Sequence, residues 1–373
     1  MYQSPLHPYG WTDELSVAFA ALDLTNPTTA PAVPGRVIFQ GRGVWRVVVG
    51  GSQVQPPDSA PPIDPEALSE HWAKPAGRVT REEDWPVTGD WVAVANTGEQ
   101  THILGVLPRS TAIKRKVAGV TTVAQVIAAN VDVVFIASSL DGDLNPRRLE
   151  RYLALVWESG AEPVIVLTKA DACDEAFLER AVAEVGAVAF GATVHVVSSA
   201  AREGIDELRA YFLPHRSVAI IGSSGIGKST LVNALAGDEV MATAGLRADG
   251  RGKHTTTHRE LVLLPGGGLI LDTPGMRELQ LWASDEGLVA TFPDVEELAA
   301  TCRFSDCGHG SEPGCAIRDA LVDGTLARDR YESWQKLERE VHHLAMRQDA
   351  RLAADERKKW KRIAKDVKGR TRP

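Results

Sequence analysis

Hydrophobic and polar positions change their period along the chain. Residues 35–118 contain short β-branched and aromatic runs between glycine and asparagine turns, a pattern typical of a small all-β domain. From about residue 125 to 275, continuous apolar runs such as VDVVFIA and PVIVLT alternate with amphipathic segments such as RRLERYLALVWE. Apolar strands that alternate with helices indicate a parallel sheet covered on both faces. The patterns predict an OB-like barrel or a sandwich, followed by an α/β domain.

The ends of the chain have patterns of their own. Residues 11–22 carry apolar side chains at helical spacing, and a proline-rich stretch follows them. Helical periodicity returns after residue 276, interrupted by a segment rich in cysteine and glycine. We expect five parts: an N-terminal helical extension (1–34), an OB-like β-barrel (35–118), an α/β domain (119–276), a helical domain (277–356) and a basic tail (357–373).

The composition is that of a soluble globular protein. Of the 373 residues, 44% are hydrophobic and 24% are charged, which excludes a chain that is disordered throughout. No apolar run approaches the ~18 residues of a membrane-spanning helix, and the first residues lack the pattern of a secretory signal. Four cysteines are too few for a disulfide scaffold. We therefore expect a cytoplasmic protein without a membrane partner.

Positive charge is concentrated at the C-terminus. Residues 357–373 hold nine Lys or Arg and one acid, which gives this segment a charge of +8. Because the net charge of the whole chain is -8, the other residues together carry -16. A basic tail on an acidic body suggests a polyanionic partner such as nucleic acid. A solvated tail that only aids solubility is the alternative. In the β region, Arg42, Trp45 and Arg46 are further candidates for RNA contact, although a strand with ordinary alternation would look the same.

A glycine-rich segment between a strand and a helix fits G-x-x-x-x-G-K-[ST]. Glycines allow backbone N–H groups to surround a phosphate, and the helix N-terminus adds partial positive charge. A lysine in this pattern neutralises β- and γ-phosphate oxygens, and the hydroxyl after it can ligate Mg²⁺. The predicted nucleotide-binding residues here are Gly222, Ser223, Ser224, Gly225, Ile226, Gly227, Lys228, Ser229 and Thr230.

Two segments downstream complete a phosphate site. Asp272 ends the apolar strand GLILD, where an acid can hold Mg²⁺ through water, and the N–H of Gly275 can contact a γ-phosphate. The polar segment 250–260 can supply Thr256 to Mg²⁺ as a switch ordered by the γ-phosphate. A surface loop is the alternative for this segment.

Upstream residues resemble the base-reading elements of GTPases. Thr168, Lys169 and Asp171 fit N-K-x-D except for the threonine, and Ser199 and Ala200 lie in a segment similar to S-A-K. The carboxylate accepts hydrogen bonds from guanine N1 and N2, which adenine cannot donate. In ordinary GTPases these elements follow the phosphate loop, whereas here they precede it. The order predicts a circularly permuted arrangement of the same site.

Together these motifs resemble the circularly permuted, ribosome small-subunit-dependent GTPases of bacteria, the RsgA type. The similarity covers most of the chain and rests on GDWVAV, NPRRLERYLAL, GSSGIGKSTLVNAL, GKHTTTH and DTPGMREL. It implies an OB-like barrel, a permuted P-loop GTPase domain and a zinc-binding helical domain. It also implies a GTP hydrolase that is stimulated by the small (30S) ribosomal subunit and acts as a late maturation checkpoint. We expect a monomer that binds GTP or GDP and contacts 16S rRNA.

Met276 occupies the position where Ras-like proteins have a glutamine that orients water, so intrinsic hydrolysis is expected to be slow. The resemblance implicates His254 in catalysis, beside Lys228 and Thr256. A surface histidine without a role is the alternative for His254. Thr168 replaces an asparagine and cannot make paired amide contacts, so guanine selectivity is expected to be softer than usual.

One cysteine-rich segment predicts a metal. Three thiols and one imidazole within 14 residues suit tetrahedral Zn²⁺, and their spacing is not that of a common finger. Reduced cysteines without a metal are the alternative. The resemblance implies the same ligand set, and four protein ligands leave no open position, so the ion is expected to be structural. The ligands are Cys302, Cys307, His309 and Cys315.

Two other classes of function stay open beside the GTP hydrolase. One is a P-loop enzyme that uses ATP, and the other is an RNA-binding module with a regulatory nucleotide site. Asp171 counts against the first, because its carboxylate has no donor pair to accept from adenine. The intact Lys228, Ser229 and Asp272 count against the second.

Overall fold

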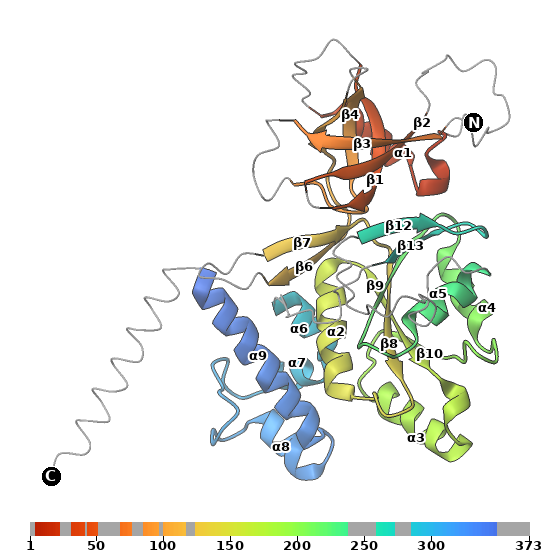
Figure 1. Ribbon diagram of the computed structural model, residues 1–373. Coiled ribbons are helices and arrows are strands. Elements are labelled where there is room, and N and C mark those ends of the chain that lie inside the picture. The colour runs from red at the N-terminus through yellow and green to blue at the C-terminus, as the bar shows by residue number, and fades with distance from the viewer. Residues whose placement is uncertain are drawn as a thin grey trace. The chain divides into compact units, whose positions relative to one another are not determined.

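We describe the protein from a computed structural model of residues 1–373 (Figure 1). The residues that the structure describes are 4–22, 31–41, 43–50, 68–76, 85–96, 100–116, 124–237, 259–272 and 285–348. The chain forms two compact units. The first comprises Met1–Lys114 and Gln125–Leu279, and the second comprises Arg115–Ala124 and Gln280–Pro373.

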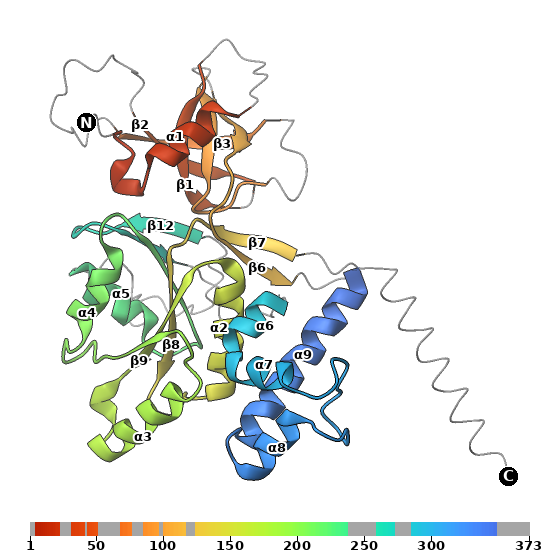
Figure 2. The same ribbon diagram turned by 180° about the vertical axis from the view of Figure 1, so that it is seen from behind.

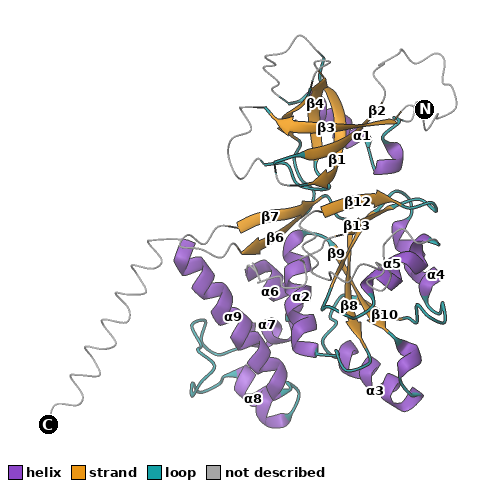
Figure 3. Ribbon diagram, in the orientation of Figure 1, coloured by secondary structure: helices purple, strands orange, loops and turns teal. Residues whose placement is uncertain are grey.

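Five strands close the N-terminal barrel (Figure 3). Their order is β1-β2-β3-β5-β4, and β4 pairs back with β1, which distinguishes a closed barrel from the sandwich that the sequence left open. The interior is filled by alternate residues of these strands, among them Val37, Trp45, Val47 and Ile103. The strands are β1 (Val33–Gln40), β2 (Trp45–Gly50), β3 (Leu68–Pro75), β4 (Trp91–Asn96) and β5 (Thr101–Val106).

The predicted N-terminal helix packs on the outside of this barrel (Figure 2). A short helix, η1 (His7–Tyr9), precedes α1 (Asp13–Ala20). The Thr12 hydroxyl caps α1 by accepting a hydrogen bond from the N–H of Leu15, at 3.4 Å. The apolar side chains Phe19 and Leu22 lie against Ala93, Ala95 and Leu104 of the barrel.

The predicted α/β alternation is confirmed in the rest of the first unit. Strand order is β10-β9-β8-β11-β13-β12, parallel throughout except that β12 runs antiparallel to β13. The strands that come first in the chain thus lie on one side of β11, and the later pair lies on the other side. They are β8 (Val133–Ser139), β9 (Glu162–Thr168), β10 (Thr193–Val196), β11 (Ser217–Ile221), β12 (Arg259–Leu263) and β13 (Leu269–Asp272).

Helices cover the sheet because its strands are apolar on both faces. Phe135 and the side chains in line with it pack against Leu208, Phe212 and Leu231, which belong to α4, η5 and α5. α2 contacts β8 and β9, and its Leu149 and Leu153 are buried as the helical spacing predicts. The helices are α2 (Pro146–Ser159), η4 (Ala170–Ala172), α3 (Glu175–Gly186), α4 (Ile205–Arg209), η5 (Ala210–Phe212) and α5 (Lys228–Ala236).

The barrel and the α/β sheet share backbone hydrogen bonding. β1 pairs antiparallel with β12, with Phe39 opposite Glu260, so the strands form one sheet of 11. The Arg46 guanidinium forms ion pairs with Glu260 of β12 and with Glu70 of β3, the latter at 3.3 Å. β12 begins at Arg259, so it includes the last two residues of the segment 250–260 that the sequence predicts to be a switch. Residues 250–258 of that segment lie outside the described residues.

A buried arginine ties the same parts together. The Arg36 side chain donates to the backbone oxygens of Tyr9, Gly89 and Asn130 and to the hydroxyl of Ser217. Burial lowers the pKa of Arg36 to about 10, which leaves the guanidinium charged at neutral pH. These four acceptors come from the N-terminal segment, the barrel, the end of β7 and β11.

The GDW motif owes its glycine to close packing at this junction. Gly89 has a φ of 94°, and a Cβ added there would lie 2.0 Å from the carbonyl oxygen of Ala129. No side chain fits such an approach. The neighbouring Asp90 is buried and accepts a two-pronged interaction from Arg109 and the N–H of Val87. The motif therefore fixes the turn before β4, which contacts the end of β7 and, through the Thr88 hydroxyl, the backbone of Arg259 in β12.

The second unit contains four helices among the residues described. The Arg330 side chain of α9 joins this helix to α6 and α7, since it bonds Asp294 at 2.7 Å, donates to the carbonyl oxygen of Thr291 and lies over the ring of Phe292. The helices are α6 (Asp285–Thr291), α7 (Pro293–Ala300), α8 (Ala316–Asp323) and α9 (Arg328–Gln348).

A separate two-stranded sheet pairs β6 (Ala112–Lys116) with β7 (Ala124–Ala129). Within the described ranges, no helix combines the length and apolar character needed to cross a membrane.

Candidate functional site

The predicted phosphate loop connects β11 to α5. It leaves the central strand of the α/β sheet at Gly222 and enters the helix at Lys228. Gly222, Gly225 and Gly227 have φ values of 143°, 84° and 89°, which L side chains rarely adopt. The ammonium of Lys228 donates to the backbone oxygens of Gly222, at 2.8 Å, and of Ser223. The loop therefore curls around its own lysine, and its glycines supply the backbone freedom that phosphate binding needs.

Gly222 is also required by a close approach between strands. A Cβ at this position would lie 2.3 Å from the carbonyl oxygen of Ala137 on β8 and 2.5 Å from Cδ1 of Ile226. Ile226 itself is buried in the core beneath the loop. An apolar side chain thus anchors the middle of the loop, while the neighbouring residues Ser224 and Gly225 are exposed.

Thr168 contacts the phosphate loop directly. It ends β9 and is buried, and its hydroxyl donates to the carbonyl oxygen of Ile226 at 2.7 Å. The predicted base-reading segment and the predicted phosphate loop therefore lie side by side, although they are 58 residues apart in the chain. The Thr168 hydroxyl binds the phosphate loop through this one hydrogen bond. Threonine has no side-chain amide that could make a second contact, as the asparagine of N-K-x-D could.

Asp171 lies in η4, immediately beyond β9. Its carboxylate accepts a hydrogen bond from the hydroxyl of Ser198, which is buried at the end of β10. Ser198 in turn accepts from the N–H of Ala201 at 3.0 Å. Within the predicted segment Ser198-Ser199-Ala200, the side chain that orients Asp171 is therefore that of Ser198.

Lys169 is held by an acid that lies outside the predicted motifs. Its backbone has a φ of 59°, and its ammonium lies 2.7 Å from Oδ2 of Asp141. Asp141 follows β8 and also accepts from the hydroxyl of Ser139 at 2.6 Å. The hydrogen bonds from Lys169 and Ser139 lower the pKa of Asp141 below its usual value. The sequence signal for Asp141 is an acid just beyond the strand next to β9. This signal can be recognised only when the strand order is known.

All these groups lie at one edge of the sheet. β8, β9, β10, β11 and β13 are parallel, so the segments that follow them meet at their carboxyl ends. Asp272 is the last residue of β13, next to β11, which places its backbone at this edge. Thr256, His254, Gly275 and the tail 357–373 lie outside the described residues.

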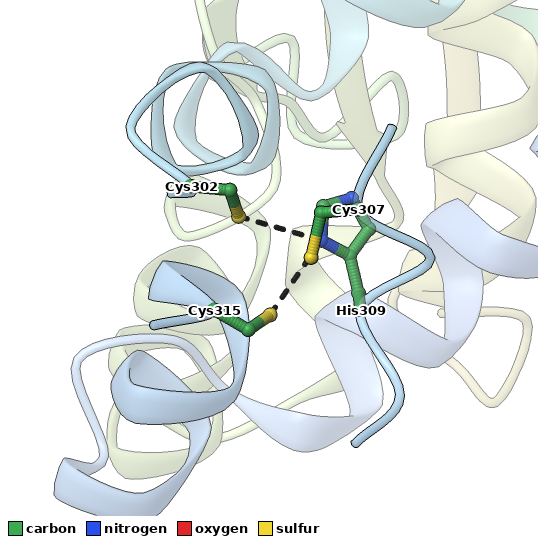
Figure 4. A group of neighbouring side chains, drawn as sticks. All are labelled: Cys302, Cys307, His309 and Cys315. Atoms are coloured by element: carbon green, nitrogen blue, oxygen red, sulfur yellow. Dashed lines mark hydrogen bonds between the residues drawn. The ribbon is translucent and has the colours of Figure 1, made fainter. Parts of the chain in front are cut away.

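The predicted metal ligands converge in the second unit (Figure 4). Their four ligand atoms all lie within 4.8 Å of one another. Nδ1 of His309 lies 3.6 Å from Sγ of Cys302 and 3.7 Å from Sγ of Cys315. A tetrahedron with Zn–S of about 2.3 Å and Zn–N of about 2.0 Å has S···N edges of roughly 3.5 Å. The cluster of Cys302, Cys307, His309 and Cys315 therefore fits a structural zinc site.

Residues around this cluster hold its ligands in place. The carboxylate of Glu312 accepts from the N–H of Gly308, at 3.2 Å, and of Gly310, at 2.8 Å, so it spans the turn that carries His309. Sγ of Cys315 caps the N-terminus of α8 by accepting a hydrogen bond from the N–H of Arg318 at 3.5 Å. The ring of His309 packs edge-on against Trp334 of α9. The cluster thus joins α8 and α9.

The candidate RNA contacts in the barrel separate into two kinds. Trp45 is buried in the core and donates to the carbonyl oxygen of Pro86, so it is a packing residue. Arg46 lies on the outer face of the barrel, over the rings of Phe39 and Trp72, and Trp72 is 60% exposed. Arg42 lies outside the described residues.

Comparison with protein families identifies two matching models. The RsgA GTPase model matches residues 106–282. A second model, described as a 50S ribosome-binding GTPase, matches residues 217–349. Among curated proteins, the small ribosomal subunit biogenesis GTPase RsgA 1 of Oceanobacillus iheyensis is 47% identical over 290 residues, covering 77% of this chain and 82% of the relative. The small ribosomal subunit biogenesis GTPase RsgA of Streptomyces avermitilis is 43% identical over 362 residues, covering 96% and 91%.

Solved structures give the same fold. YjeQ from Thermotoga maritima matches with a TM-score of 0.60 and 25% identity, over 83% of this chain and 99% of that one. YloQ, described as a circularly permuted GTPase, matches with a TM-score of 0.59 and 22% identity, over 85% and 97%. The permuted order predicted from the motifs is therefore confirmed at the level of the fold.

Proposed function

Because the chain belongs to the RsgA GTPase family, we propose that it hydrolyses GTP during the assembly of the small ribosomal subunit, in the cytoplasm. The observation that carries this proposal is the hydrogen bond between Thr168 and Ile226. It joins a base-reading segment to a phosphate loop, so one nucleotide can reach both. We further propose that 16S rRNA is the contacted component of the subunit.

Different residues at the sheet edge bind the base, the phosphates and the metal ion of the nucleotide. Asp171, oriented by Ser198, accepts from the two guanine donors, N1–H and the exocyclic amine. Lys228 and the N–H groups of residues 222–229 bind the β- and γ-phosphates. Ser229 and Thr256 would ligate Mg²⁺ directly, and Asp272 would do so through water. When bound, Mg²⁺ supplies neutralisation of the charge on the transferring phosphate.

His254 is the proposed group that completes the site for hydrolysis. Met276 follows the Asp272–Gly275 segment and cannot orient water through a strong hydrogen bond. A histidine has a ring nitrogen that can form such a hydrogen bond with water. We propose that docking on the subunit positions this side chain, which makes turnover depend on the partner.

The basic tail and the barrel are the proposed contacts to RNA. The tail carries a charge of +8 over residues 357–373, which suits a phosphate backbone. On the barrel, Arg46 beside the exposed ring of Trp72 is the better candidate, since Trp45 is in the core. Such contacts make subunit binding sensitive to salt.

Phosphate release from GTP and from ATP, with and without isolated small subunits, tests the proposal. We expect GTP to be strongly preferred and its turnover to rise when subunits are added. Equal turnover of both nucleotides would favour the ATP-dependent enzyme. Binding without turnover under any condition would favour an RNA-binding module with a regulatory nucleotide site.

A further inference from the structure

Asp141 occupies a place at the sheet edge that none of the sequence motifs explains. It follows β8, which lies between β9 and β11 in the sheet. The base-reading segment follows β9, and the phosphate loop follows β11. A nucleotide that reaches from Asp171 to the phosphate loop must therefore cross the end of β8, where Asp141 lies.

The Lys169 side chain bridges the same interval. Its backbone belongs to the β9 segment, and its ammonium is bound 2.7 Å from Asp141 at the end of β8. The aliphatic stem is thus drawn from the base-reading segment toward the phosphate-loop side. A stem in this position offers an apolar surface to the face of a base, while the charged end stays bound and partly hydrated.

The local geometry indicates that this position is fixed. Lys169 has a φ of 59°, a backbone conformation that costs free energy in a residue other than glycine and persists where the surroundings determine it. Asp141 is in turn held by Ser139, at 2.6 Å, so both oxygens of its carboxylate are engaged. Two loops 28 residues apart are therefore joined by one ion pair.

We propose that Asp141 is a positioning residue of the guanine site, which holds the Lys169 ammonium so that the Lys169 stem covers one face of the base. The inference rests on the proposed assignment of Thr168, Lys169 and Asp171 to base reading. This role of Asp141 is specific to this chain, because the Thr168 hydroxyl donates to Ile226 and Thr168 has no amide that could contact the base. Contact with the base then depends more heavily on Lys169 and Asp171.

The test compares Asp141→Asn with Asp206→Asn in the full chain. Asp206 is a matched control because its carboxylate also forms a 2.7 Å ion pair, with Arg209, on the exposed surface of α4. A fluorescent GDP analogue is displaced by GDP, by ADP and by inorganic tripolyphosphate, which has phosphates but no base. Steady-state kinetics with GTP separate KM from kcat, and melting temperatures check that each variant is folded.

We expect Asp141→Asn to weaken GDP binding roughly 2- to 5-fold, the range for loss of one solvated ion pair, and to leave tripolyphosphate binding as in the wild type. KM for GTP rises by a similar factor, kcat changes less than twofold, and Asp141→Glu recovers part of the affinity. Ser139→Ala, which keeps the ion pair, shifts GDP affinity in the same direction by a smaller factor.

Two results would overturn the inference. One is GDP binding by Asp141→Asn that equals that of Asp206→Asn. The other is an equal loss of GDP and tripolyphosphate binding, which would mean a general disturbance of the site. A wild-type protein that binds ADP as tightly as GDP would instead contradict the assignment of the guanine site itself, so the two failures are distinguishable.

Discussion

Removal of the Arg36 side chain is expected to destabilise the first unit more than any surface change. Arg36 is 2% exposed, and its guanidinium donates to four buried oxygens, at 2.8 Å for Ser217, 2.9 Å for Asn130 and 3.3 Å for Gly89, with Tyr9 as the fourth. Each buried acceptor left without a donor costs about 1–3 kcal/mol. Water can replace some of these bonds, so we expect Arg36→Met to lower the free energy of unfolding by about 3–5 kcal/mol.

Urea unfolding followed by tryptophan fluorescence measures this change. The Trp91 ring lies 5.0 Å from Cζ of Arg36 and reports on the region. Arg46→Met is the control, because the Arg46 pairs with Glu70 and Glu260 are partly exposed, and such pairs contribute about 0–1 kcal/mol. If Arg36→Met unfolds at the same urea concentration as Arg46→Met, the view of Arg36 as the link between the barrel and the α/β sheet is wrong.

Three further predictions concern turnover, metal and partner. His254→Ala is expected to bind GDP as the wild type does and to lose subunit-stimulated phosphate release, and unchanged stimulation would refute its role. Removal of zinc by a chelator, or Cys315→Ser, is expected to lower the helical signal and protease resistance of the second unit with no change in GDP binding; a parallel loss of GDP binding would contradict a purely structural ion. Deletion of residues 357–373 is expected to weaken subunit binding and to reduce its dependence on salt, and equal affinity at all salt concentrations would exclude the tail as a phosphate contact.

Features encoded in short segments could be predicted from the sequence. The strands and helices of the α/β domain follow from local periodicity, as the burial of Leu149 and Leu153 in α2 shows. The phosphate loop and the cysteine cluster each lie within one short stretch, so their spacing alone indicates their chemistry. The catalytic and magnesium-binding roles of Thr256 and His254 stay predictions.

Features that depend on strand order could not be predicted in this way. Closure of the barrel needs the pairing of β1 with β4, and its link to the α/β sheet needs the pairing of β1 with β12. Arg36 gathers acceptors up to 181 residues away in the chain. Asp141 becomes part of the site only because β8 lies between β9 and β11. Trp45 was a candidate for RNA contact but is buried in the barrel. Its position in a strand did not show which face of the strand would be exposed.

If Asp171 reads the base of a nucleotide whose phosphates occupy the loop at Lys228, exchange of its carboxylate must change which base is preferred. Asp171→Asn exchanges an acceptor for an amide, which pairs poorly with the guanine donors but can donate to the C2 oxygen of xanthine. We predict that this variant prefers XTP to GTP in subunit-stimulated phosphate release. A variant that hydrolyses GTP as the wild type does and gains nothing with XTP would contradict the account.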